Sequence, residues 1–422
     1  MRLWRLSSVA LLSLGSPLSP PPAAAADFPV RGFLFVEATH RDARVTPLNP
    51  DNLFRLSSDQ LETAILLEGD KEGLSWRVRG EAIGQVDQWP ERKRIRIQEL
   101  AYQRKAGERW AFSIGKQERS WDSGLAFRPL GFFRTRPDIR DPTDREGRQQ
   151  GLPLVSATYI GDAFTAELVV SEDVFGNVDD EIEARQWAAR LSGQVGKLDA
   201  SLVVRQAAGQ RPGAGGSLTY AAGAIELHGD AYVGPRPRRL RHGGLLGRED
   251  DEVPGALYPS DPFFIDRGGR GTILNSVAGI TWAPNGKIGV TAEYIHQGSG
   301  LSGRRWSTYL DLIASHRAAL DTSLRGLAVS NLAYDLGVLR SPVRRDYLFV
   351  RVTASRHGFS ATGSAFAGLA DASAAVSFTL SHALVRKVEA QLAFSAFVGN
   401  SRSEFGLVPF GSVARLSLRR PF

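Results

Sequence analysis

The stretch Gly411-Ser412-Val413-Ala414-Arg415-Leu416-Ser417-Leu418-Arg419-Arg420-Pro421-Phe422 decides the fold that we expect for this chain. Within it the apolar residues Ala414, Leu416 and Leu418 alternate with polar ones. Because successive side chains of a strand point to opposite faces, the alternation predicts a strand with one apolar and one charged face. Such a strand suits a closed barrel in a lipid bilayer, where the outer face meets hydrocarbon and the inner face meets water.

The same alternation recurs along most of the chain. Residues Leu74–Gln85, Phe164–Val170 and Lys197–Arg205 each place apolar and polar side chains at alternate positions. In the last of these segments, Leu198 and Ala200 alternate with Asp199 and Ser201. The alternation changes phase within Arg94–Arg104, where we expect either a β-bulge or a different strand register.

Short turns separate these segments, and one longer connection lies between most consecutive turns. Most of the eight short turns are rich in Gly, Asn or Asp, as β-hairpin turns are, and residues 385–387 fit this pattern least. One strand on each side of every turn, an opening strand near Gly32–Thr39 and the closing strand give eighteen, with sixteen or twenty as alternatives. The prediction is an all-β fold, a single antiparallel transmembrane β-barrel over residues 27–422. The turns lie at residues 69–73, 104–108, 161–162, 193–196, 221–223, 283–286, 355–358 and 385–387.

Composition and the first residues narrow the class further. No internal run reaches the roughly 18 apolar residues of a membrane helix, and the chain has no cysteine for a disulfide or a thiolate metal site. Residues 1–26 combine an early positive charge, a short apolar core and Ala24-Ala25-Ala26, which predicts a secretory signal peptide cleaved near Ala26. Scattered Arg residues in an exported chain argue against nucleic acid as a partner.

Large aromatic residues occur beside the short turns, at positions that the alternation assigns to the outer face. Amphipathic rings prefer the boundary between membrane and water, so these residues predict an aromatic girdle around one rim of the barrel. The predicted girdle residues are Trp76, Tyr102, Trp110, Tyr159, Trp282, Phe359 and Phe422.

Charged residues occupy the opposite, inward phase. A charge facing lipid near the bilayer centre costs a few kcal/mol, so these side chains are expected to face the lumen. They either line a polar conduit or brace its walls through ion pairs. The predicted pore-lining residues are Arg77, Arg79, Glu81, Arg109, Glu167, Arg190, Arg205, Glu226, Asp230, Glu293, Arg351, Glu389, Arg415 and Arg419.

Two long connections have features of their own. Residues 118–150 join an apolar patch around Phe132 to a run of charges, which predicts a loop that either constricts the lumen or covers it as a lid. Residues 306–338 have apolar spacings closer to those of a helix, and we expect a helical insert there. The charged residues predicted to act in the constriction are Arg128, Arg134, Arg136, Asp138, Arg140 and Asp141.

The closing strand and the first of these loops resemble parts of known barrels. A last strand that ends in Phe is similar to the C-terminal strand of Gram-negative outer-membrane β-barrels. The run Gly115-Lys116-Gln117, followed by Trp121, Gly124 and Pro129, resembles alginate-export-type and related porin-like barrels, although Asp122 stands where Gly is usual. The resemblance implies an outer-membrane location, short turns in the periplasm, contact with lipopolysaccharide, and recognition of the last strand by the barrel-assembly machinery.

The function predicted from these features is a porin-like channel for polar or charged solutes, including an anionic saccharide or polysaccharide. A non-conducting barrel that anchors an envelope assembly is an alternative, and an outer-membrane hydrolase is a weaker one. Glu226, His228 and Asp230 share one strand face, but their pattern matches no common catalytic motif. We therefore predict no enzyme activity, no catalytic residue, no metal and no cofactor.

Overall fold

The computed structural model describes eleven ranges of residues, which together make up most of the chain. These ranges are 30–56, 58–85, 92–133, 151–172, 185–236, 239–242, 257–259, 263–266, 271–339, 342–384 and 387–422. The predicted signal peptide and residues 134–150 lie outside them. All statements below concern the described ranges.

Eighteen strands form one antiparallel sheet in the described part of the chain, so the predicted strand number is confirmed. The first nine are β1 (Val30–Ala43), β2 (Asp59–Lys71), β3 (Leu74–Gln85), β4 (Arg92–Ala106), β5 (Trp110–Gln117), β6 (Leu152–Ile160), β7 (Phe164–Ser171), β8 (Gln186–Val195) and β9 (Leu198–Ala207). The others are β10 (Gly213–Ala222), β11 (Ile225–Pro235), β14 (Thr272–Trp282), β15 (Ile288–Gln297), β16 (Asp346–Arg356), β17 (Phe359–Gly368), β18 (Ser373–Ala383), β19 (Glu389–Val398) and β20 (Phe410–Pro421).

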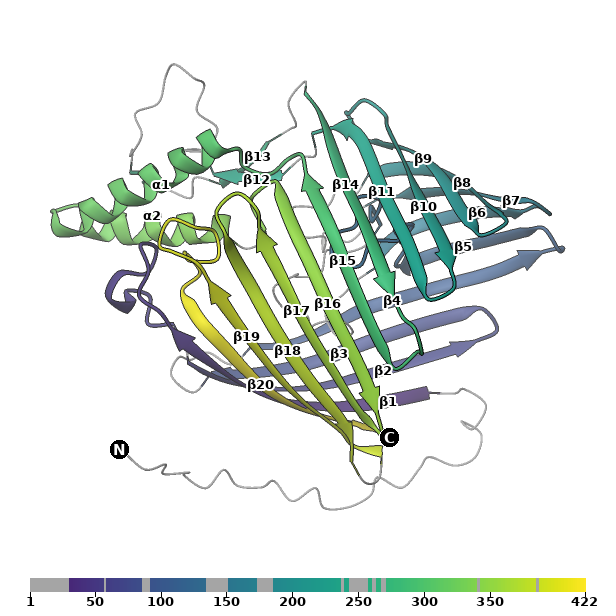
Figure 1. The fold of residues 1–422 in the computed structure, drawn as a ribbon, viewed down its shortest axis with the longest axis horizontal. Coiled ribbons are helices and arrows are strands. Elements are labelled where there is room, and N and C mark those ends of the chain that lie inside the picture. The colour runs from purple at the N-terminus through teal and green to yellow at the C-terminus, as the bar shows by residue number, and fades with distance from the viewer. Residues whose placement is uncertain are drawn as a thin grey trace.

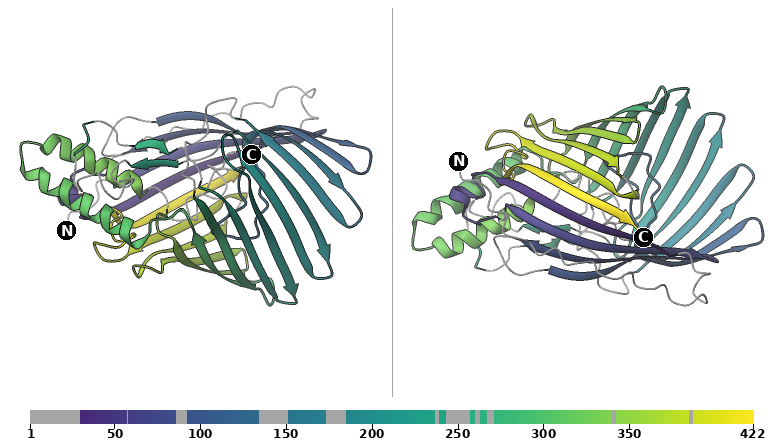
Figure 2. Two further views of the ribbon diagram at one scale, coloured as in Figure 1. Left: turned by 90° about the horizontal axis from the view of Figure 1, so that it is seen from above. Right: turned by 90° about the horizontal axis from the view of Figure 1, so that it is seen from below.

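The closing strand joins the sheet into a barrel. Each strand pairs with the next one along the sheet, and β20 also pairs with β1, from Phe33 opposite Pro421 to Ala43 opposite Phe410. Figure 2 shows these two strands side by side although they lie at opposite ends of the chain. Beyond the strand, Gly32 and Phe422 exchange backbone hydrogen bonds of 3.2 and 2.9 Å. Closure satisfies the backbone polar groups of both edge strands, as a hydrocarbon surrounding requires.

The change of phase predicted in β4 is a β-bulge. Arg77 pairs with Glu99 and the next residue, Val78, pairs with Ile97, so Gln98 is the extra residue. The bulge turns Ile97 and Leu100 to the same outer face although an odd number of positions separates them. Gln98 is buried instead, and its carbonyl accepts a hydrogen bond from the Gly151 amide at 3.1 Å.

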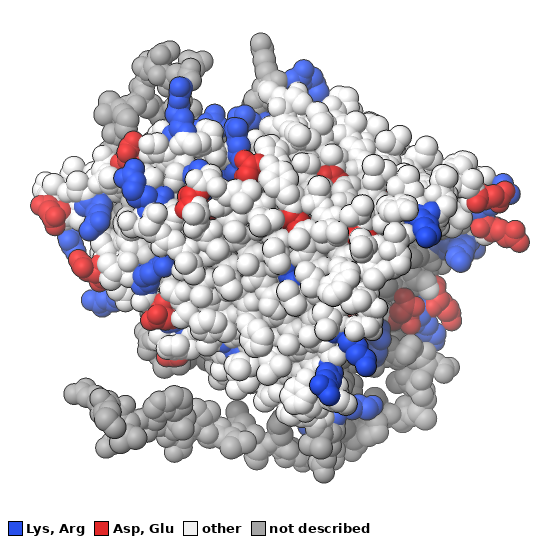
Figure 3. Space-filling view, viewed as in Figure 1, with Lys and Arg blue, Asp and Glu red and all other residues white. Residues whose placement is uncertain are grey.

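An apolar belt surrounds the outside of the barrel. Outward residues such as Leu202, Leu218, Phe378 and Leu392 are exposed, whereas their inward neighbours are polar or buried. On the face shown in Figure 3, Lys, Arg, Asp and Glu gather toward the ends, and little charge interrupts the surface between them. Exposed aliphatic and aromatic side chains in such a belt are stable in hydrocarbon and unfavourable in water.

The short turns gather at one end, which we call the tight-turn end. Glu72-Gly73 and His357-Gly358 have positive φ at both residues, as type I′ hairpin turns require. The predicted girdle residues lie at this end, where Trp110 contacts Tyr159 edge to face at 5.1 Å and Phe359 stacks on His382 at 3.8 Å between ring centroids. The ring of Trp76 covers Gly69, its cross-strand partner, and the ring of Phe422 covers Gly32 in the same way.

Helices and longer connections cover the opposite, long-loop end (Figure 1). The connection after β15 contains α1 (Gly303–Ala318), η4 (Ala319–Asp321) and α2 (Arg325–Val338), so it adds no strands to the sheet there. The short helix η2 (Pro50–Asn52) follows β1, and a small separate hairpin consists of β12 (Arg239–His242) and β13 (Phe263–Asp266). The helices bury Tyr309, Ile313 and Leu332 against Leu48 and Leu407 from the other connections. None of the described helices is long and apolar enough to cross a membrane.

Candidate pore and its inward loop

Residues 118–133, which we call the inward loop, cross the inside of the barrel. The loop leaves β5, and its ends meet where Arg119 and Phe133 form an isolated antiparallel bridge. Leu125, Ala126 and Phe127 pack against a cluster that contains Tyr347 of β16. Around the sheet β16 is nine strands from β5, which is the opposite side of an eighteen-stranded barrel. The inward loop therefore spans the lumen from wall to wall.

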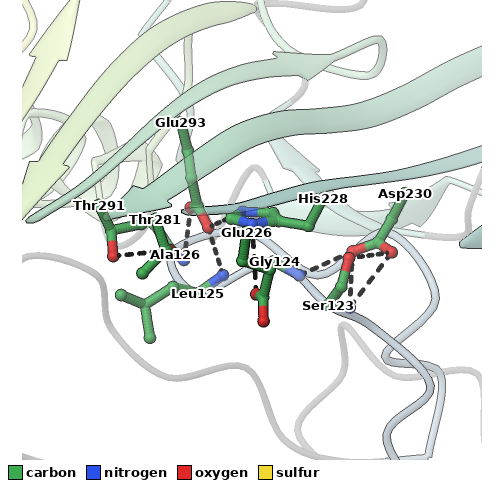
Figure 4. Close-up of polar contacts among 10 residues, drawn as sticks. All are labelled: Ser123, Gly124, Leu125, Ala126, Glu226, His228, Asp230, Thr281, Thr291 and Glu293. Carbon is green, nitrogen blue, oxygen red and sulfur yellow. Dashed lines mark hydrogen bonds and ion pairs between the residues drawn. The ribbon is translucent and has the colours of Figure 1, made fainter. Parts of the chain in front are cut away.

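Two carboxylates of the barrel wall hold the tip of this loop (Figure 4). Asp230 of β11 accepts hydrogen bonds from the backbone amide and hydroxyl of Ser123, at 2.9 and 2.7 Å, and from the Gly124 amide at 2.8 Å. Glu293 of β15 accepts from the amides of Leu125 at 2.6 Å and Ala126 at 2.9 Å. Hydrogen bonds to a charged acceptor are about twice as strong as neutral ones. Four of these five bonds come from backbone amides, so the loop tip is fixed mainly by its backbone.

A third group completes this arrangement. The imidazole Nε2 of His228 lies 3.0 Å from the Glu293 carboxylate, and the side chains of both residues are almost fully buried. The three residues Glu226, His228 and Asp230, which the sequence places on one strand face, thus have different surroundings. No group of His, Asp and Glu within the described ranges has the arrangement of a metal site.

Apolar packing holds the two limbs of the inward loop against the wall. Trp121, Leu130 and Phe133 are buried against inward side chains of β6 to β11, including Val169 and Val203. The ring of Trp121 meets that of Phe133 edge to face at 5.5 Å, and its Nε1 donates to Glu167 of β7 at 2.9 Å. The neighbouring Phe132 ring lies under the guanidinium of Arg205, 4.7 Å from the ring centroid.

Asp122 organises the loop from within. Its carboxylate accepts hydrogen bonds from the Leu130 backbone amide and from the Ser120 hydroxyl, which closes residues 122–130 into a compact turn. Burial raises the pKa of this carboxyl to about 7, and the negative charge of nearby Asp230 adds to the rise. Asp122 therefore supplies the loop with an internal cap.

A second connection also enters the lumen. Phe405, between β19 and β20, is fully buried against Phe366 and Phe397 in the cluster that the inward loop contacts. Glu404 anchors it by accepting hydrogen bonds from the Tyr347 hydroxyl and the Val343 amide, both at 2.8 Å. Arg44 donates to the carbonyls of Phe397, Phe405, Gly406 and Val408. The sequence pattern did not indicate this connection as part of the pore.

Several predicted lumen residues are paired along the wall formed by β2 to β4. Arg79 lies 2.8 Å from Glu62 and 3.2 Å from Glu81, and Arg96 lies 3.2 Å from the other oxygen of Glu81. All of these side chains are largely buried. Arg77 lies 3.4 Å from Glu68. On this wall the charges meet each other across neighbouring strands, the arrangement of a bracing network.

The other predicted lumen residues have varied surroundings. Arg415 is 3.1 Å from Glu37, and the guanidinium of Arg419 lies 4.2 Å from the centroid of the Phe33 ring. Arg351 is partly buried on the inward face of β16, and Glu389 is exposed on the inward phase of β19. Arg109 lies in the turn before β5 instead of on a strand, and it donates to the hydroxyl of outward-facing Tyr159 at 3.2 Å.

Arg190 and Glu226 line an open chamber of about 620 Å³. It lies between residues 120–123 of the inward loop and the tight-turn end, against the inward faces of β7 to β11. Of the charged residues predicted for the constriction, Arg128 lies in the inward loop. Arg134, Arg136, Asp138, Arg140 and Asp141 lie outside the described residues.

A closed antiparallel barrel with an apolar belt, a polar interior and a loop folded into the lumen defines the class of porin-like transmembrane barrels. Solved structures share this fold. OccK11 (OpdR) of Pseudomonas aeruginosa is similar over 94% of this chain and 96% of its own, with a TM-score of 0.50 and 11% sequence identity. A BenF-like porin from Pseudomonas fluorescens Pf-5 is similar over 93% of this chain and 98% of its own, with a TM-score of 0.50 and 9% identity.

No protein-family model matches the sequence, and no curated protein matches it. At identities near one residue in ten, the likeness to the solved structures concerns the fold. The geometry of the lumen is therefore the main evidence for the function of this chain.

Proposed function

We propose that this protein is an outer-membrane channel through which polar or charged solutes diffuse, and that the inward loop forms its constriction. The observation that carries the proposal is the attachment of the loop tip to the barrel wall, to Asp230 of β11 and to Glu293 of β15, which is eight strands from β5. A loop that only covered the rim would have no need of buried carboxylates deep in the barrel. The polar inner face of the barrel, the inward loop and the chamber beside it supply a polar path suited to hydrated solutes.

The location follows from the same reasoning. An apolar belt with aromatic residues at one rim suits a bilayer, and a signal peptide cleaved near Ala26 would deliver the chain to the envelope. We propose that the belt meets outer-membrane lipid and lipopolysaccharide, and that the barrel-assembly machinery recognises the last strand. Described lumen charges form hydrogen bonds with the loop and ion pairs with one another. We therefore assign them to solute passage and to bracing of the wall instead of catalysis.

Excision of the loop tests the channel proposal. Arg119 and Phe133 pair at the base of the loop, so residues 121–131 can be replaced by three glycines without displacing either end. We expect the variant to show a larger single-channel conductance than the intact protein in planar bilayers. The control is replacement of residues 326–330 in α2, at the long-loop end, by alanine.

Two results would count against the proposal. Folded intact protein that neither conducts nor permits solute swelling of liposomes would favour the alternative of a non-conducting anchor. A normal conductance that is unchanged by the excision would keep the channel but remove the inward loop as its constriction.

A further inference from the structure

The chamber beside the inward loop has an unusual charge. Among the described residues, four carboxylates line its cavity of about 620 Å³, and one guanidinium, that of Arg190, accompanies them. Arg190 pairs in register with Glu167 on the neighbouring strand, so its charge is shared with a carboxylate outside the lining. One of the four, Asp122, is partly neutral near pH 7 because burial raises its pKa to about 7. The other three still give the described lining an excess of negative charge, in a chain whose total charge is positive. The four carboxylates are Asp122, Asp162, Asp199 and Glu226.

Two of these carboxylates are available to a solute. Asp199 is exposed on the inward phase of β9, and within the described residues it makes no hydrogen bond or ion pair. Glu226 is half-exposed, and its carboxylate lies 3.9 Å from Nδ1 of the His228 imidazole. Asp162, by contrast, lies 3.5 Å from Arg109 at the rim, and Asp122 is engaged within the loop.

A buried hydroxyl gives a second, independent indication of a ligand. Ser201 lines the same chamber and is 6% exposed, yet its Oγ has no hydrogen-bond partner within the described residues. Buried polar atoms are nearly always hydrogen-bonded, to protein, water or a ligand. Ser192, Ser217 and Thr219 add further hydroxyls to the lining. The walls thus offer acceptors of two kinds, carboxylates and hydroxyls.

The spacing of the two available carboxylates limits the shape of the ligand. Asp199 pairs with Thr219 and Glu226 pairs with Ala221, so the two acids flank β10 and are offset by two residues along it. Two strand spacings and a two-residue rise separate such positions by roughly 12 Å. A single small cation would meet one acid at a time. A flexible chain with separated positive charges can meet both.

We propose that this chamber binds organic cations that carry two or more separated protonated amines, and that the channel favours them over anions. The inference rests on the proposed channel function and deepens it by naming the solute class. An ammonium group donates three hydrogen bonds, which suits carboxylate and hydroxyl acceptors. An acidic saccharide, the solute that the sequence predicted, would be repelled by the same carboxylates.

Calorimetry on the folded barrel in detergent tests the binding step, with spermidine as the probe. We expect spermidine to bind the intact protein, and the double variant Asp199→Asn, Glu226→Gln to bind at least about tenfold more weakly, as the loss of two charge-assisted bonds implies. Glu389→Gln is the matched control, because Glu389 is an exposed lumen carboxylate of β19, across the barrel from the chamber. It should leave the affinity unchanged.

A second measurement separates this inference from the channel proposal. In planar bilayers with a salt gradient, the intact channel should be cation-selective, and the double variant should shift the reversal potential toward anions. Spermidine bound equally by the intact protein and the double variant, or a wild-type channel that prefers anions, would overturn the inference while leaving the channel intact. Spermidine binding without any conductance would support the chamber and overturn the channel. If the double variant does not fold, Asp199→Asn alone replaces it, with an expected weakening in the same direction.

Discussion

The Glu293 carboxylate accepts a hydrogen bond from the backbone amide of Leu125 at 2.6 Å, which joins β15 to a loop that begins at β5. A second bond from Ala126 and a contact with His228 complete the surroundings of this carboxylate. Because the acceptor is charged and buried, each such bond contributes about 1.5–3 kcal/mol. The position of the loop therefore depends on side chains of the barrel wall, and substitutions of these side chains should alter the current through the pore.

Glu293→Gln should loosen the inward loop. Leu125 and Ala126 donate to different oxygens of the carboxylate, and in glutamine one of these oxygens becomes an NH2 group that faces a backbone amide without accepting from it. We expect amide hydrogen exchange over residues 123–127 to accelerate by about tenfold, consistent with the loss of one such bond, together with noisier open-channel currents. Glu389→Gln removes a lumen charge elsewhere and should change neither quantity. Unaltered exchange in the Glu293 variant would show that apolar packing alone fixes the loop.

The loop should become less stable as pH rises from about 4 through about 7. Burial raises the pKa of Asp122 to about 7, so the folded state favours the neutral carboxyl, whereas the unfolded loop ionises near pH 4. Between these two pKa values the unfolded loop binds fewer protons than the folded loop, so the folding stability falls as pH rises. The fall ends once Asp122 is ionised in the folded loop as well. Asp230 and Arg128 are the charged groups that influence it besides burial. Exchange over residues 123–131, corrected for its intrinsic pH dependence, should increase in the intact protein and stay constant in Asp122→Asn.

The barrel was predictable because its constraints are local and repeated. Period-two alternation and Gly-rich turns are visible in each hairpin, and the phase change in β4 indicated the bulge at Gln98. The inward loop's attachments were harder to predict. Its tip is held through backbone amides, and a sequence pattern does not show which amides a distant carboxylate will meet. Ser123 and Gly124 are small enough to let Asp230 approach the backbone of the loop. Ser and Gly are also common in loops that make no such contact, so they did not mark this site.

The charge balance of the lumen was likewise hidden. Alternation identified the inward phase of residues such as Arg79 and Glu226, but pairing depends on which strands are neighbours and on their register. Arg79 is neutralised by Glu62 and Glu81, whereas Glu226 remains accessible in the chamber. The prediction that the solutes include an anionic saccharide did not account for this pairing, and the chamber that we propose favours solutes of the opposite sign.

Gly69→Ala should destabilise the barrel more than Gly80→Ala. A methyl group at Gly69 would lie 2.7 Å from Nε1 of Trp76, so the ring would have to leave its place over the hairpin. At Gly80, on the adjacent strand, the same methyl group meets no atom within 4 Å. We expect a loss of roughly 1 kcal/mol or more for Gly69→Ala relative to Gly80→Ala, since overpacking costs about that much. Urea unfolding from lipid vesicles, followed by tryptophan fluorescence, measures the difference.

His316→Leu should open the helical cover at the long-loop end. The imidazole Nδ1 lies 2.7 Å from the Asp335 carboxylate, the pair joins α1 to α2, and both side chains are fully buried. Burial raises the pKa of Asp335, and the hydrogen bond to His316 opposes that rise. Removing one partner of a buried pair typically costs about 3–5 kcal/mol, because the other is left uncompensated, whereas replacing both by apolar residues can be neutral.

Limited trypsin digestion of the folded barrel measures this effect, because α1 and the start of α2 contain Arg317 and Arg325. The single variant should be cleaved at these residues faster than the intact protein, and the double variant His316→Leu, Asp335→Leu should return toward the intact rate. Cleavage after Arg356, the last residue of β16 before the tight turn to β17, serves as the internal reference because it lies at the opposite end of the barrel. If the double variant is cleaved as fast as the single one, the pair contributes specific geometry that apolar packing cannot replace, and the two helices depend on it to stay closed over the barrel.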